Sequence, residues 1–564
     1  MRMSKRILKY SVIFNGICKI RYNNTVKYTV FPLALVEAAL VVSFSTFNSL
    51  WAFFTIILRK FLLIFISSII VVIIKNIYFH IDYIVFSKFL ILDILSKLFS
   101  FKTLIIHLSF SISILSYIIS LNSIITSEKA YQLIILTPII YTLQHIIFDL
   151  DRPPYGYTST FIQNNNNGFY FLNNRIIIKS ILLSACNFIL SILFWLDFNS
   201  LNFIIPLLIF LHFEIIMLSF NNKIMMGPIY KNHLLSTYSS YPIKTLLDGL
   251  KYRPNSNQAF VRVTAFQELS LRAISLDPND RKEIYYIKYF NPIFKLCLDV
   301  IENTYEEINE YLITLEPDAY KLDRNRNKKF TPKYRYTKYG YSNIETSNST
   351  SIIHSFGQKL MKSFNIFSFN NEKINKNKLA EKLVPIPMLF TSSMLSITSL
   401  LIVGINSKDS LISELVKLSL NESLIKIKNS IGVMGNWVEK WEDLKRSNLK
   451  TDELENESNN NHNNLDLISA LYEVSVGSFL EIISECKDSL NDVILDDDVV
   501  QLSKWVLETY SYKDNKYDDY LQNNDNEYYR KDAFRPVDDS SVQCFIDDDD
   551  DYEEEYRKYL NDPY

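Results

Sequence analysis

The sequence predicts an all-α protein, in which a six-span transmembrane helical bundle is followed by a soluble α-helical domain that a disordered linker interrupts. Apolar runs follow one another before residue 224, each near the roughly 20 residues with which a helix crosses a ~30 Å hydrocarbon core. The chain after that point is more polar and keeps helical periodicity. The charged residues are also distributed unevenly between these two parts of the chain. Residues 1–223 hold 18 Lys and Arg against 8 Asp and Glu, whereas residues 224–564 hold 41 against 53.

Charge and cysteine content argue against several classes of protein. An acidic second half speaks against direct nucleic-acid binding, because phosphate contacts need clustered Lys and Arg. A basic first half suits anionic lipid head groups. The five cysteines are odd in number and include no CxxC pair, which argues against a disulfide framework and a cysteine zinc site. We therefore expect reduced thiols facing cytosol or nucleoplasm, and no metal or other cofactor.

The membrane domain is expected in residues 29–223, behind a basic N-terminal tail of residues 1–28. The tail holds seven Lys or Arg, no acidic residue and no signal peptide, so the first span must act as the insertion signal. The second apolar run contains Arg59 and Lys60, and its span starts either near Trp51, with both side chains reaching the interface, or after Lys60. We predict six spans, with five or seven as alternatives: Phe31–Phe47, Leu50–Ile74, Leu104–Ile125, Tyr131–Leu150, Ile176–Leu196 and Ile204–Phe220.

Loop charges predict the orientation of these spans. Basic residues gather in the N-terminal tail, between Lys75 and Lys102, and in residues 151–175, whereas the other three connections are short and nearly uncharged. This alternation places both termini on the positive, non-lumenal side of the membrane. Ile81–Leu98 is apolar but interrupted by frequent charges, so we expect it to form an amphipathic helix in the membrane interface.

Residues 224–315 are expected to form a soluble helical region. Tyr241–Leu250 has the pattern of a short helix with Pro242 in its first turn. A longer helix is predicted over Asn257–Ser275, and Tyr286–Leu315 continues the helical pattern. One face of the longer helix carries an apolar stripe at three- and four-residue spacing: Phe260, Val263, Phe266, Leu269 and Ala273.

Residues 316–375 are predicted to be a disordered linker. They lose the helical periodicity, begin with the basic stretch Lys321–Lys338 and then become rich in Ser and Asn. The basic stretch could instead bind lipid or an acidic partner, or serve as a nuclear import signal.

Residues 376–510 regain helical periodicity and are predicted to form a soluble helical domain. Within it, Pro385–Val403 is apolar enough to imitate a seventh span, but it contains two prolines and six Ser or Thr. We expect it to be a buried helix, against which Leu411–Leu444 and Leu465–Tyr510 pack. Residues 511–564 end in runs of acidic residues, which repel one another, so this tail is predicted to be disordered.

One histidine of the apolar half lies near carboxylates. His145, Asp149 and Asp151 fall at the end of the fourth predicted span, and a histidine beside carboxylates could bind a metal ion or move protons. A membrane di-iron enzyme would need several histidines at helical spacing, however. We therefore expect a polar cap where this helix meets the head groups.

Two acidic residues lie within predicted spans. Glu37 and Glu214 are costly to bury in a bilayer, which makes them candidates for transport chemistry, but they could also pair with Arg59, Lys60 or a partner protein. The chain contains no GxxxxGK[ST], GxGxxG or GxSxG motif, so phosphate cradling and nucleophile-elbow chemistry lack support. We expect no enzyme, and we assign no catalytic, cofactor-binding or metal-binding residue.

Three stretches of the chain carry a family resemblance. Tyr241–Tyr285 reads YPIKTLLDGLKYRPNSNQAFVRVTAFQELSLRAISLDPNDRKEIY, and we call it the signature segment. Pro138–Asp149 reads PIIYTLQHIIFD and Leu379–Pro387 reads LAEKLVPIP. All three resemble the nuclear division cycle (NDC) family of transmembrane nucleoporins, fungal type, in which such a signature follows the last span. Six spans with both ends on one face are also that family's layout.

The resemblance implies a non-enzymatic anchor at the nuclear envelope. Members of that family sit where the inner and outer nuclear membranes join, hold the nuclear pore complex there and, in fungi, help to insert and duplicate the spindle pole body. Roles in mRNA and protein transport follow from the pore itself. The implied partners are other nucleoporins (membrane, inner-ring and linker nucleoporins), spindle pole body components and the lipid bilayer. A multi-span transporter or a lipid-modifying enzyme is the alternative.

Three polar residues belong to the helix predicted over Asn257–Ser275, which we call the signature helix. Gln267, Glu268 and Arg272 lie among its apolar positions. We expect them to make structural hydrogen bonds before partner contacts, because buried polar groups need partners. The remaining exposed faces of the soluble helices would then receive other nucleoporins.

Overall fold

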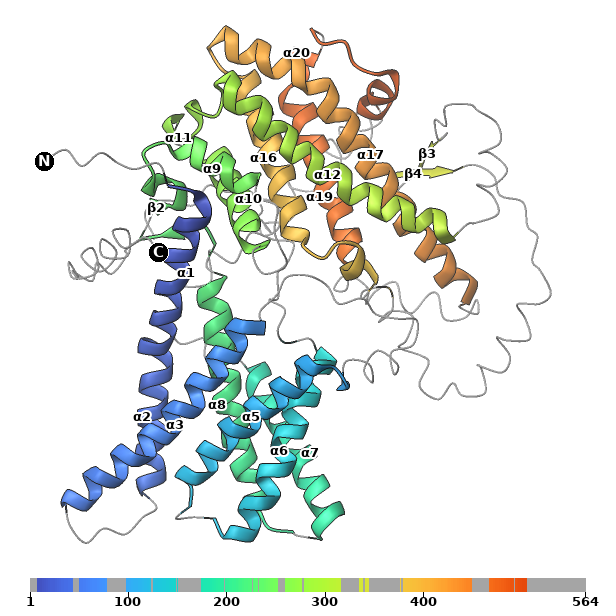
Figure 1. Ribbon diagram of the computed structural model, residues 1–564. Coiled ribbons are helices and arrows are strands. Elements are labelled where there is room, and N and C mark those ends of the chain that lie inside the picture. Colours follow the sequence, from blue (N-terminus) through green and yellow to red (C-terminus); the bar gives the residue numbers. More distant parts are fainter. Residues whose placement is uncertain are drawn as a thin grey trace, which may run out of the picture. The chain divides into compact units, whose positions relative to one another are not determined.

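Long α-helices make up nearly all of the secondary structure in the computed structural model of the chain (Figure 1), which confirms the predicted all-α class. The chain divides into two units. Unit 1 comprises Met1–Ser240, Lys251–Glu268 and Lys378–Met388, and unit 2 comprises Tyr241–Leu250, Leu269–Asn377 and Leu389–Tyr564. The structure describes residues 8–43, 50–78, 98–122, 125–148, 150, 174–196, 198–225, 227–231, 233–251, 259–275, 278–315, 334–337, 340–343, 376, 379–448, 466–490 and 492–504.

Unit 1 begins with one continuous helix that starts well before the first predicted span. It consists of α1 (Tyr10–Thr25), the π-helical segment η1 (Val26–Val30) and α2 (Phe31–Ser43). The basic tail is therefore helical from Tyr10 onward. A stripe at helical spacing explains why, since these side chains of α1 are all buried: Tyr10, Ile13, Phe14, Ile17, Arg21 and Thr25.

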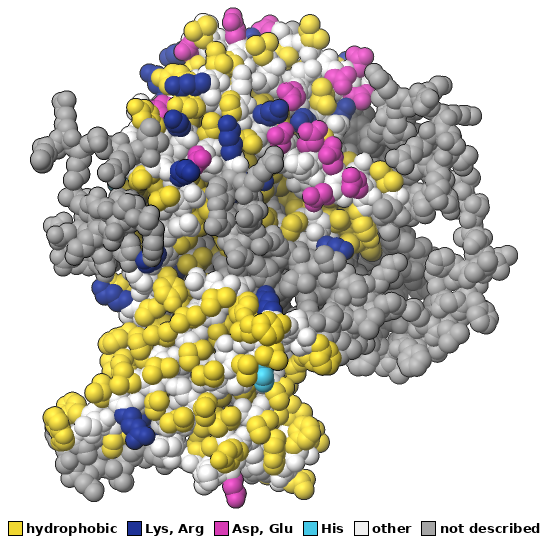
Figure 2. Space-filling view, in the orientation of Figure 1, with side chains coloured by type: hydrophobic (Ala, Val, Ile, Leu, Met, Phe, Trp, Pro, Cys, Tyr) yellow, Lys and Arg dark blue, Asp and Glu magenta, His cyan; other side chains and the backbone are white. Residues whose placement is uncertain are grey.

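The apolar bundle is formed by α2 and by the helices that follow it in unit 1: α3 (Leu50–Tyr78), α5 (Phe101–Ser120), α6 (Ser127–Phe148), α7 (Asn174–Trp195) and α8 (Leu201–Ile224). Each helix packs against the next along the chain, and α3 also packs against α8 (Figure 1). Aromatic side chains such as Phe110, Phe210 and Phe213 fill its core. Its visible outer face in Figure 2 consists mostly of apolar side chains, with few charged ones among them.

Seven helical stretches among the described residues are long and apolar enough to cross a membrane: Tyr10–Ser43, Phe53–Tyr78, Phe101–Ser120, Ile176–Trp195, Leu201–Ile224, Pro387–Ile405 and Leu467–Glu485. The first five overlap predicted spans. Helix α6, which corresponds to the predicted span Tyr131–Leu150, is not among the seven. Its polar side chains Thr137, Gln144 and His145 are buried in the bundle, so α6 can be less apolar than its neighbours. The count of six spans stays a prediction.

Helix α3 shows how its two basic residues are accommodated. It runs without a break from Leu50, past Arg59 and Lys60, to Tyr78. Lys60 is buried, and its Nζ lies 2.6 Å from the backbone oxygen of Ser120, the last residue of α5. A cation at this position is favourable, because the last carbonyl groups of a helix lack partners and carry partial negative charge.

A small hairpin and a 3-10 turn follow α8 in unit 1. Strand β1 (Ile229–Tyr230) pairs antiparallel with β2 (His233–Leu234), and η4 (Leu235–Tyr238) follows directly. Lys231 in the connection has a positive φ of 49°. The signature helix α10 (Ala259–Ile274) contributes its residues up to Glu268 to this unit.

Unit 2 is built from helices close to the predicted ones. The earlier ones are α9 (Pro242–Leu250) and α11 (Pro278–Lys282), which belong to the signature segment, and α12 (Ile287–Leu315), which follows it. The later ones are α16 (Pro387–Ile405), α17 (Ser410–Asn448), α19 (Leu467–Glu485) and α20 (Lys487–Leu490). Helix α17 packs against both α12 and α19, and most of α16 is buried, as expected of a helix in a folded domain.

Some expectations fall on parts that the structure does not describe. The interfacial helix predicted for Ile81–Leu98 lies outside the described residues except for Leu98, and the acidic tail 511–564 lies outside them entirely. Within the predicted linker 316–375, only one antiparallel hairpin is described. It consists of β3 (Tyr334–Thr337) and β4 (Gly340–Asn343).

Gly404 of α16 marks a close helix approach in unit 2. A Cβ atom at this position would lie 2.5 Å from Val416 Cγ2 and 3.0 Å from Tyr285 Cε1. Val416 is fully buried on α17 and β-branched, so it has little freedom to move away. Gly404→Ala is therefore expected to lower the free energy of unfolding by about 1–3 kcal/mol, the usual cost of overpacking.

Gly477 supplies the matched control, because a Cβ atom there meets nothing within 4 Å. It is exposed within α19, where alanine is expected to raise the free energy of unfolding by about 0.5–1 kcal/mol through helix propensity. Thermal unfolding of the detergent-solubilised full chain compares the two variants. Equal stability of Gly404→Ala and Gly477→Ala would contradict the close packing of α16 on α17.

Candidate anchoring site

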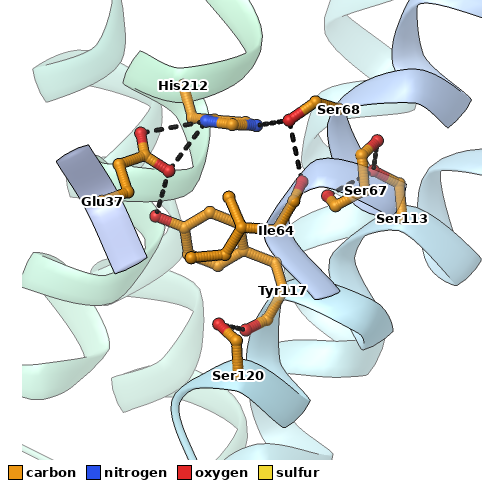
Figure 3. Close-up of polar contacts among 8 residues, drawn as sticks. All are labelled: Glu37, Ile64, Ser67, Ser68, Ser113, Tyr117, Ser120 and His212. Carbon is orange, nitrogen blue, oxygen red and sulfur yellow. Dashed lines mark hydrogen bonds and ion pairs between the residues drawn. The ribbon is translucent and has the colours of Figure 1, made fainter. Parts of the chain in front are cut away.

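A buried polar network joins four helices of the apolar bundle (Figure 3). His212 of α8 lies at its centre, with Nδ1 2.9 Å from Glu37 Oε1 on α2 and Nε2 2.9 Å from Ser68 Oγ on α3. Tyr117 of α5 donates its hydroxyl to Glu37 Oε2 at 3.0 Å. Ser68 also donates its own proton to the carbonyl oxygen of Ile64 at 2.8 Å.

The second acidic residue of the bundle is also paired. Glu214 of α8 lies 2.8 Å from Lys179 Nζ on α7 and accepts a hydrogen bond of 3.1 Å from Gln144 Nε2 on α6. Glu37 thus pairs with His212, and Glu214 pairs with Lys179. Neither of them pairs with Arg59 or Lys60, which was one of the alternatives that the sequence left open. The first pair links α2 to α8, and the second links the consecutive helices α7 and α8, so both serve to hold helices of the apolar bundle together.

Serine side chains hold α3 and α5 together beside this network. The hydroxyls of Ser67 and Ser113 lie 2.8 Å apart, and Ser113 also reaches the backbone oxygen of Ser67 at 2.9 Å (Figure 3). Ser116 donates to the backbone oxygen of Leu63 at 2.8 Å. Small polar residues at these positions let two helices approach closely and bond across their interface.

His145 does not form the polar cap that was expected. It is buried, and its ring packs against Phe110 at 5.1 Å and Tyr141 at 5.4 Å between centroids. His145 is in the last turn of α6, but its ring packs against Phe110 of α5 inside the bundle. Asp149 and Asp151 lie outside the described residues. Among the described residues, no group of three or more His, Cys, Asp and Glu side chains could hold a metal ion.

Arg21 joins the first helix to the end of α8. This residue of α1 is buried, and its Nη2 donates to the backbone oxygens of Gly227 at 2.8 Å and Ile229 at 3.0 Å. Its Nη1 lies 3.4 Å from the backbone oxygen of Ile224, the last residue of α8. A guanidinium with several donors in one plane can satisfy these carbonyl groups together.

Glu268 of the signature helix joins the start of the first helix to the 3-10 turn. Its carboxylate is fully buried and accepts the hydroxyl of Tyr10 at 2.9 Å. The same carboxylate accepts the backbone N–H of Ser236 at 3.1 Å and the Ser236 hydroxyl. The structural hydrogen bonds expected of Glu268 are therefore present. They tie α1, and with it the first helix of the apolar bundle, to the signature helix.

The rest of the signature segment is held within unit 2. Arg272 is buried and lies 3.9 Å from Asp280, which also accepts the Ser275 hydroxyl at 2.9 Å. Tyr285 donates its hydroxyl to the backbone oxygen of Leu400 at 2.9 Å, and burial raises the pKa of Tyr285 well above its ordinary value. These charged and polar residues of the signature segment serve folding contacts.

Sequence reasoning missed Tyr10, Arg21 and His212. The first two lie on the buried stripe of α1, whose three- and four-residue spacing is visible in the sequence and would have extended the helix into the tail. His212 gave no such signal, because its partners Glu37 and Ser68 lie far away along the chain.

A family model confirms the resemblance. Residues 198–381 match the model described as nucleoporin protein Ndc1-Nup. The match begins just before α8 and contains the whole signature segment, including Glu268 and the residues around Arg272. Of the residues that connect the apolar bundle to the signature helix, Ser236 and Glu268 lie inside the matched range, whereas Tyr10 and the rest of the first helix lie outside it. Over residues 198–381 the chain is thus similar to the Ndc1 nucleoporins, which supports a nucleoporin role in the nuclear pore.

Proposed function

We propose that this nucleoporin anchors the nuclear pore complex in the membrane of the nuclear envelope, with its apolar bundle spanning the bilayer. The outer surface of the bundle supports this proposal. Large apolar side chains are exposed along α3 and α7, including Leu62, Ile66, Leu182 and Leu193. Soluble monomers rarely expose apolar patches of this extent, whereas lipid tails cover them without cost.

The observation that carries the proposal is the link between the bundle and the signature helix. One continuous helix runs from Tyr10 to Ser43, with its bundle part held by the Glu37–His212 pair and its other end held by Glu268. A force applied to the signature helix is therefore transmitted to a membrane-spanning helix that packs against other spans. An anchor needs such a connection, and it needs no reaction.

The orientation of the anchor follows from the ends of its helices. Lys75, Lys102, Lys179 and Lys223 lie near helix ends next to the longer connections, and Lys27 lies where the apolar part of the first helix begins. By the positive-inside rule, we place both termini on the cytoplasmic or pore side. The partners there would be membrane, inner-ring and linker nucleoporins and, in a fungal cell, components of the spindle pole body, whose insertion the anchor would assist.

Localisation and protease protection test this proposal. A fluorescent fusion of the full chain is expected to label the nuclear rim in puncta, and protease added to intact nuclei should reach the C-terminal part. Diffuse reticular or plasma-membrane labelling would contradict the anchor. A C-terminal part enclosed in the perinuclear lumen would contradict the orientation, because the pore scaffold lies on the other side.

The buried ion pairs favour a second candidate, a multi-span transporter or lipid-modifying enzyme. Alanine at Glu37, Glu214 or His145 separates it from the anchor. An anchor variant that folds is expected to keep its place at the nuclear rim, whereas a transporter or enzyme would lose activity while staying folded and in place.

The two acidic variants should also differ in stability. Glu37→Ala leaves His212 and Tyr117 buried without their acceptor and is expected to lower the free energy of unfolding by about 1–3 kcal/mol. Glu214→Ala removes the acceptor of the buried Gln144 Nε2 but is expected to cost less than Glu37→Ala, because its second partner, Lys179, has a side chain that is 31% exposed and can turn to water or head groups. Thermal unfolding in one detergent measures both, and a larger loss for Glu214→Ala would contradict the network.

A further inference from the structure

The first helix of unit 1 and α8 lie side by side where their apolar stretches end. Thr29 of η1 and Ser219 of α8 lie with their hydroxyls 2.7 Å apart, at the end of the apolar stretch of each helix. About one turn further out, Lys223 Nζ donates to the backbone oxygen of Asn24 at 2.8 Å. Residues 24–29 of the first helix therefore lie beside residues 219–223 of α8.

Two ammonium groups meet one phenol ring at this level. Lys27 Nζ lies 5.1 Å and Lys223 Nζ lies 5.4 Å from the ring centroid of Tyr28. The Tyr28 side chain is 54% exposed, and Lys27 is exposed as well. Lys223 uses one N–H donor for Asn24 and keeps others for a ligand. Two like charges are thus gathered around one exposed aromatic ring.

The chemistry of this cluster fits the head group of a lipid. Tyrosine is enriched at the boundary of hydrocarbon and water, where its ring stays apolar and its hydroxyl meets head groups. Lysine reaches the same level from a helix end and holds a phosphate as a point charge. A second Lys–Tyr contact, Lys102 Nζ at 5.3 Å from the ring of Tyr78, also lies at helix ends of the bundle but brings one ammonium group.

We propose that Lys27, Tyr28 and Lys223 bind the phosphate of an anionic phospholipid. The two ammonium groups would approach the phosphate oxygens, with the Tyr28 hydroxyl as a further donor. A lipid of net negative charge is preferred, because two lysines attract a head group that is negative overall more strongly than a neutral one; in phosphatidylserine the carboxylate offsets the ammonium and leaves that net negative charge. The proposal rests on the proposed function, since it needs η1 and the end of α8 at the membrane surface.

Purified full chain in detergent tests the site, with the thermal unfolding temperature followed as phosphatidylserine or phosphatidylcholine is added. Phosphatidylserine is expected to raise that temperature at lower concentration than phosphatidylcholine. Lys27→Gln should raise the phosphatidylserine concentration for half the effect about fivefold, since a basic residue at a membrane surface contributes about that much, and Lys27→Gln/Lys223→Gln about thirtyfold. Lys27 is exposed, so the single variant keeps the fold.

Lys129→Gln is the matched control, because Lys129 lies at the start of α6, next to a short connection at the other end of the bundle. It should respond to phosphatidylserine as the wild type does. Three results would overturn the site: an equal response to phosphatidylcholine, an unchanged response of the double variant, or the same stabilisation by inorganic phosphate at equal concentration.

Alkaline carbonate extraction separates this proposal from the anchor. A wild-type chain that leaves the membrane pellet contradicts the anchor itself. A chain that stays in the pellet but binds phosphatidylserine no better than phosphatidylcholine contradicts only the lipid site.

Discussion

Glu268→Ala is expected to lower the free energy of unfolding by about 3 kcal/mol or more, the largest loss among the single substitutions considered. The carboxylate is fully buried and serves Tyr10 and both polar groups of Ser236. Hydrogen bonds to a charged group contribute about 1.5–3 kcal/mol each and are not additive, and a buried donor left without an acceptor costs its desolvation. Glu268→Gln keeps one acceptor oxygen and should lose less.

Two further variants sharpen this test. Tyr10→Phe removes a single hydrogen bond from the same carboxylate and should cost about 1–2 kcal/mol. Glu283→Ala removes an exposed glutamate of the same signature segment and should stay within about 0.5 kcal/mol of wild type. Thermal unfolding of the detergent-solubilised chain measures all of them. If Glu268→Ala were no less stable than Glu283→Ala, the link between α1 and the signature helix would be refuted.

Loss of Glu268 should also weaken anchoring at the nuclear pore, because the same hydrogen bonds hold the first helix to the signature helix. At a temperature where Glu268→Ala is still membrane-inserted, we expect weaker nuclear-rim labelling of a fluorescent fusion than for Glu283→Ala. Equal labelling of the two variants would mean that the pore does not depend on this connection.

Asp466→Ala is expected to cost about 3 kcal/mol, because this buried carboxylate has three partners in unit 2. It caps the start of α19 through Ser469, lies 2.8 Å from Lys376 Nζ and accepts Trp437 Nε1–H at 3.0 Å. Its removal leaves a buried indole N–H without an acceptor, breaks an ion pair and deletes a helix cap. Asp492→Ala is the control, because its pair with Lys417 is exposed and contributes little.

Asp466 should also make unit 2 sensitive to acid. Burial alone would raise the pKa of Asp466, but the ion pair with Lys376 and the hydrogen bonds from Lys376, Ser469 and Trp437 outweigh it and hold the pKa below its ordinary value. A carboxyl group with a lowered pKa in the folded state contributes stability above its unfolded pKa of about 3.9, and this is lost as the pH falls through the folded value.

The acid response is measured by comparing wild type with Asp466→Asn. From pH 7 to 5 the difference in unfolding temperature between them should stay constant. Below about pH 4 it should shrink, since the wild-type carboxyl group becomes protonated as well. A difference that grew towards acid would show that the pKa of Asp466 is raised in the folded chain.

Local patterns were sufficient for much of the fold. The apolar runs of α5, α7 and α8 and the stripe of α10 are each legible within about 20 residues, because helical burial repeats every three or four positions. The signature segment was recognisable for the same reason, since its pattern is continuous in sequence. Where polar residues break the pattern, as in α6, composition alone did not separate a helix buried among other helices from one facing lipid.

The sequence by itself determined the helical class, the division into an apolar and a more polar half, and the similarity to the Ndc1 nucleoporins. Only the tertiary structure decided which charges meet. Glu37 pairs with His212 rather than with Arg59 or Lys60, His145 lies among aromatic rings rather than in a polar cap, and Glu268 accepts Tyr10. The reason is physical: helical periodicity is a local property of the chain, whereas the partner of a buried charge is set by how distant helices pack, which no local spacing encodes.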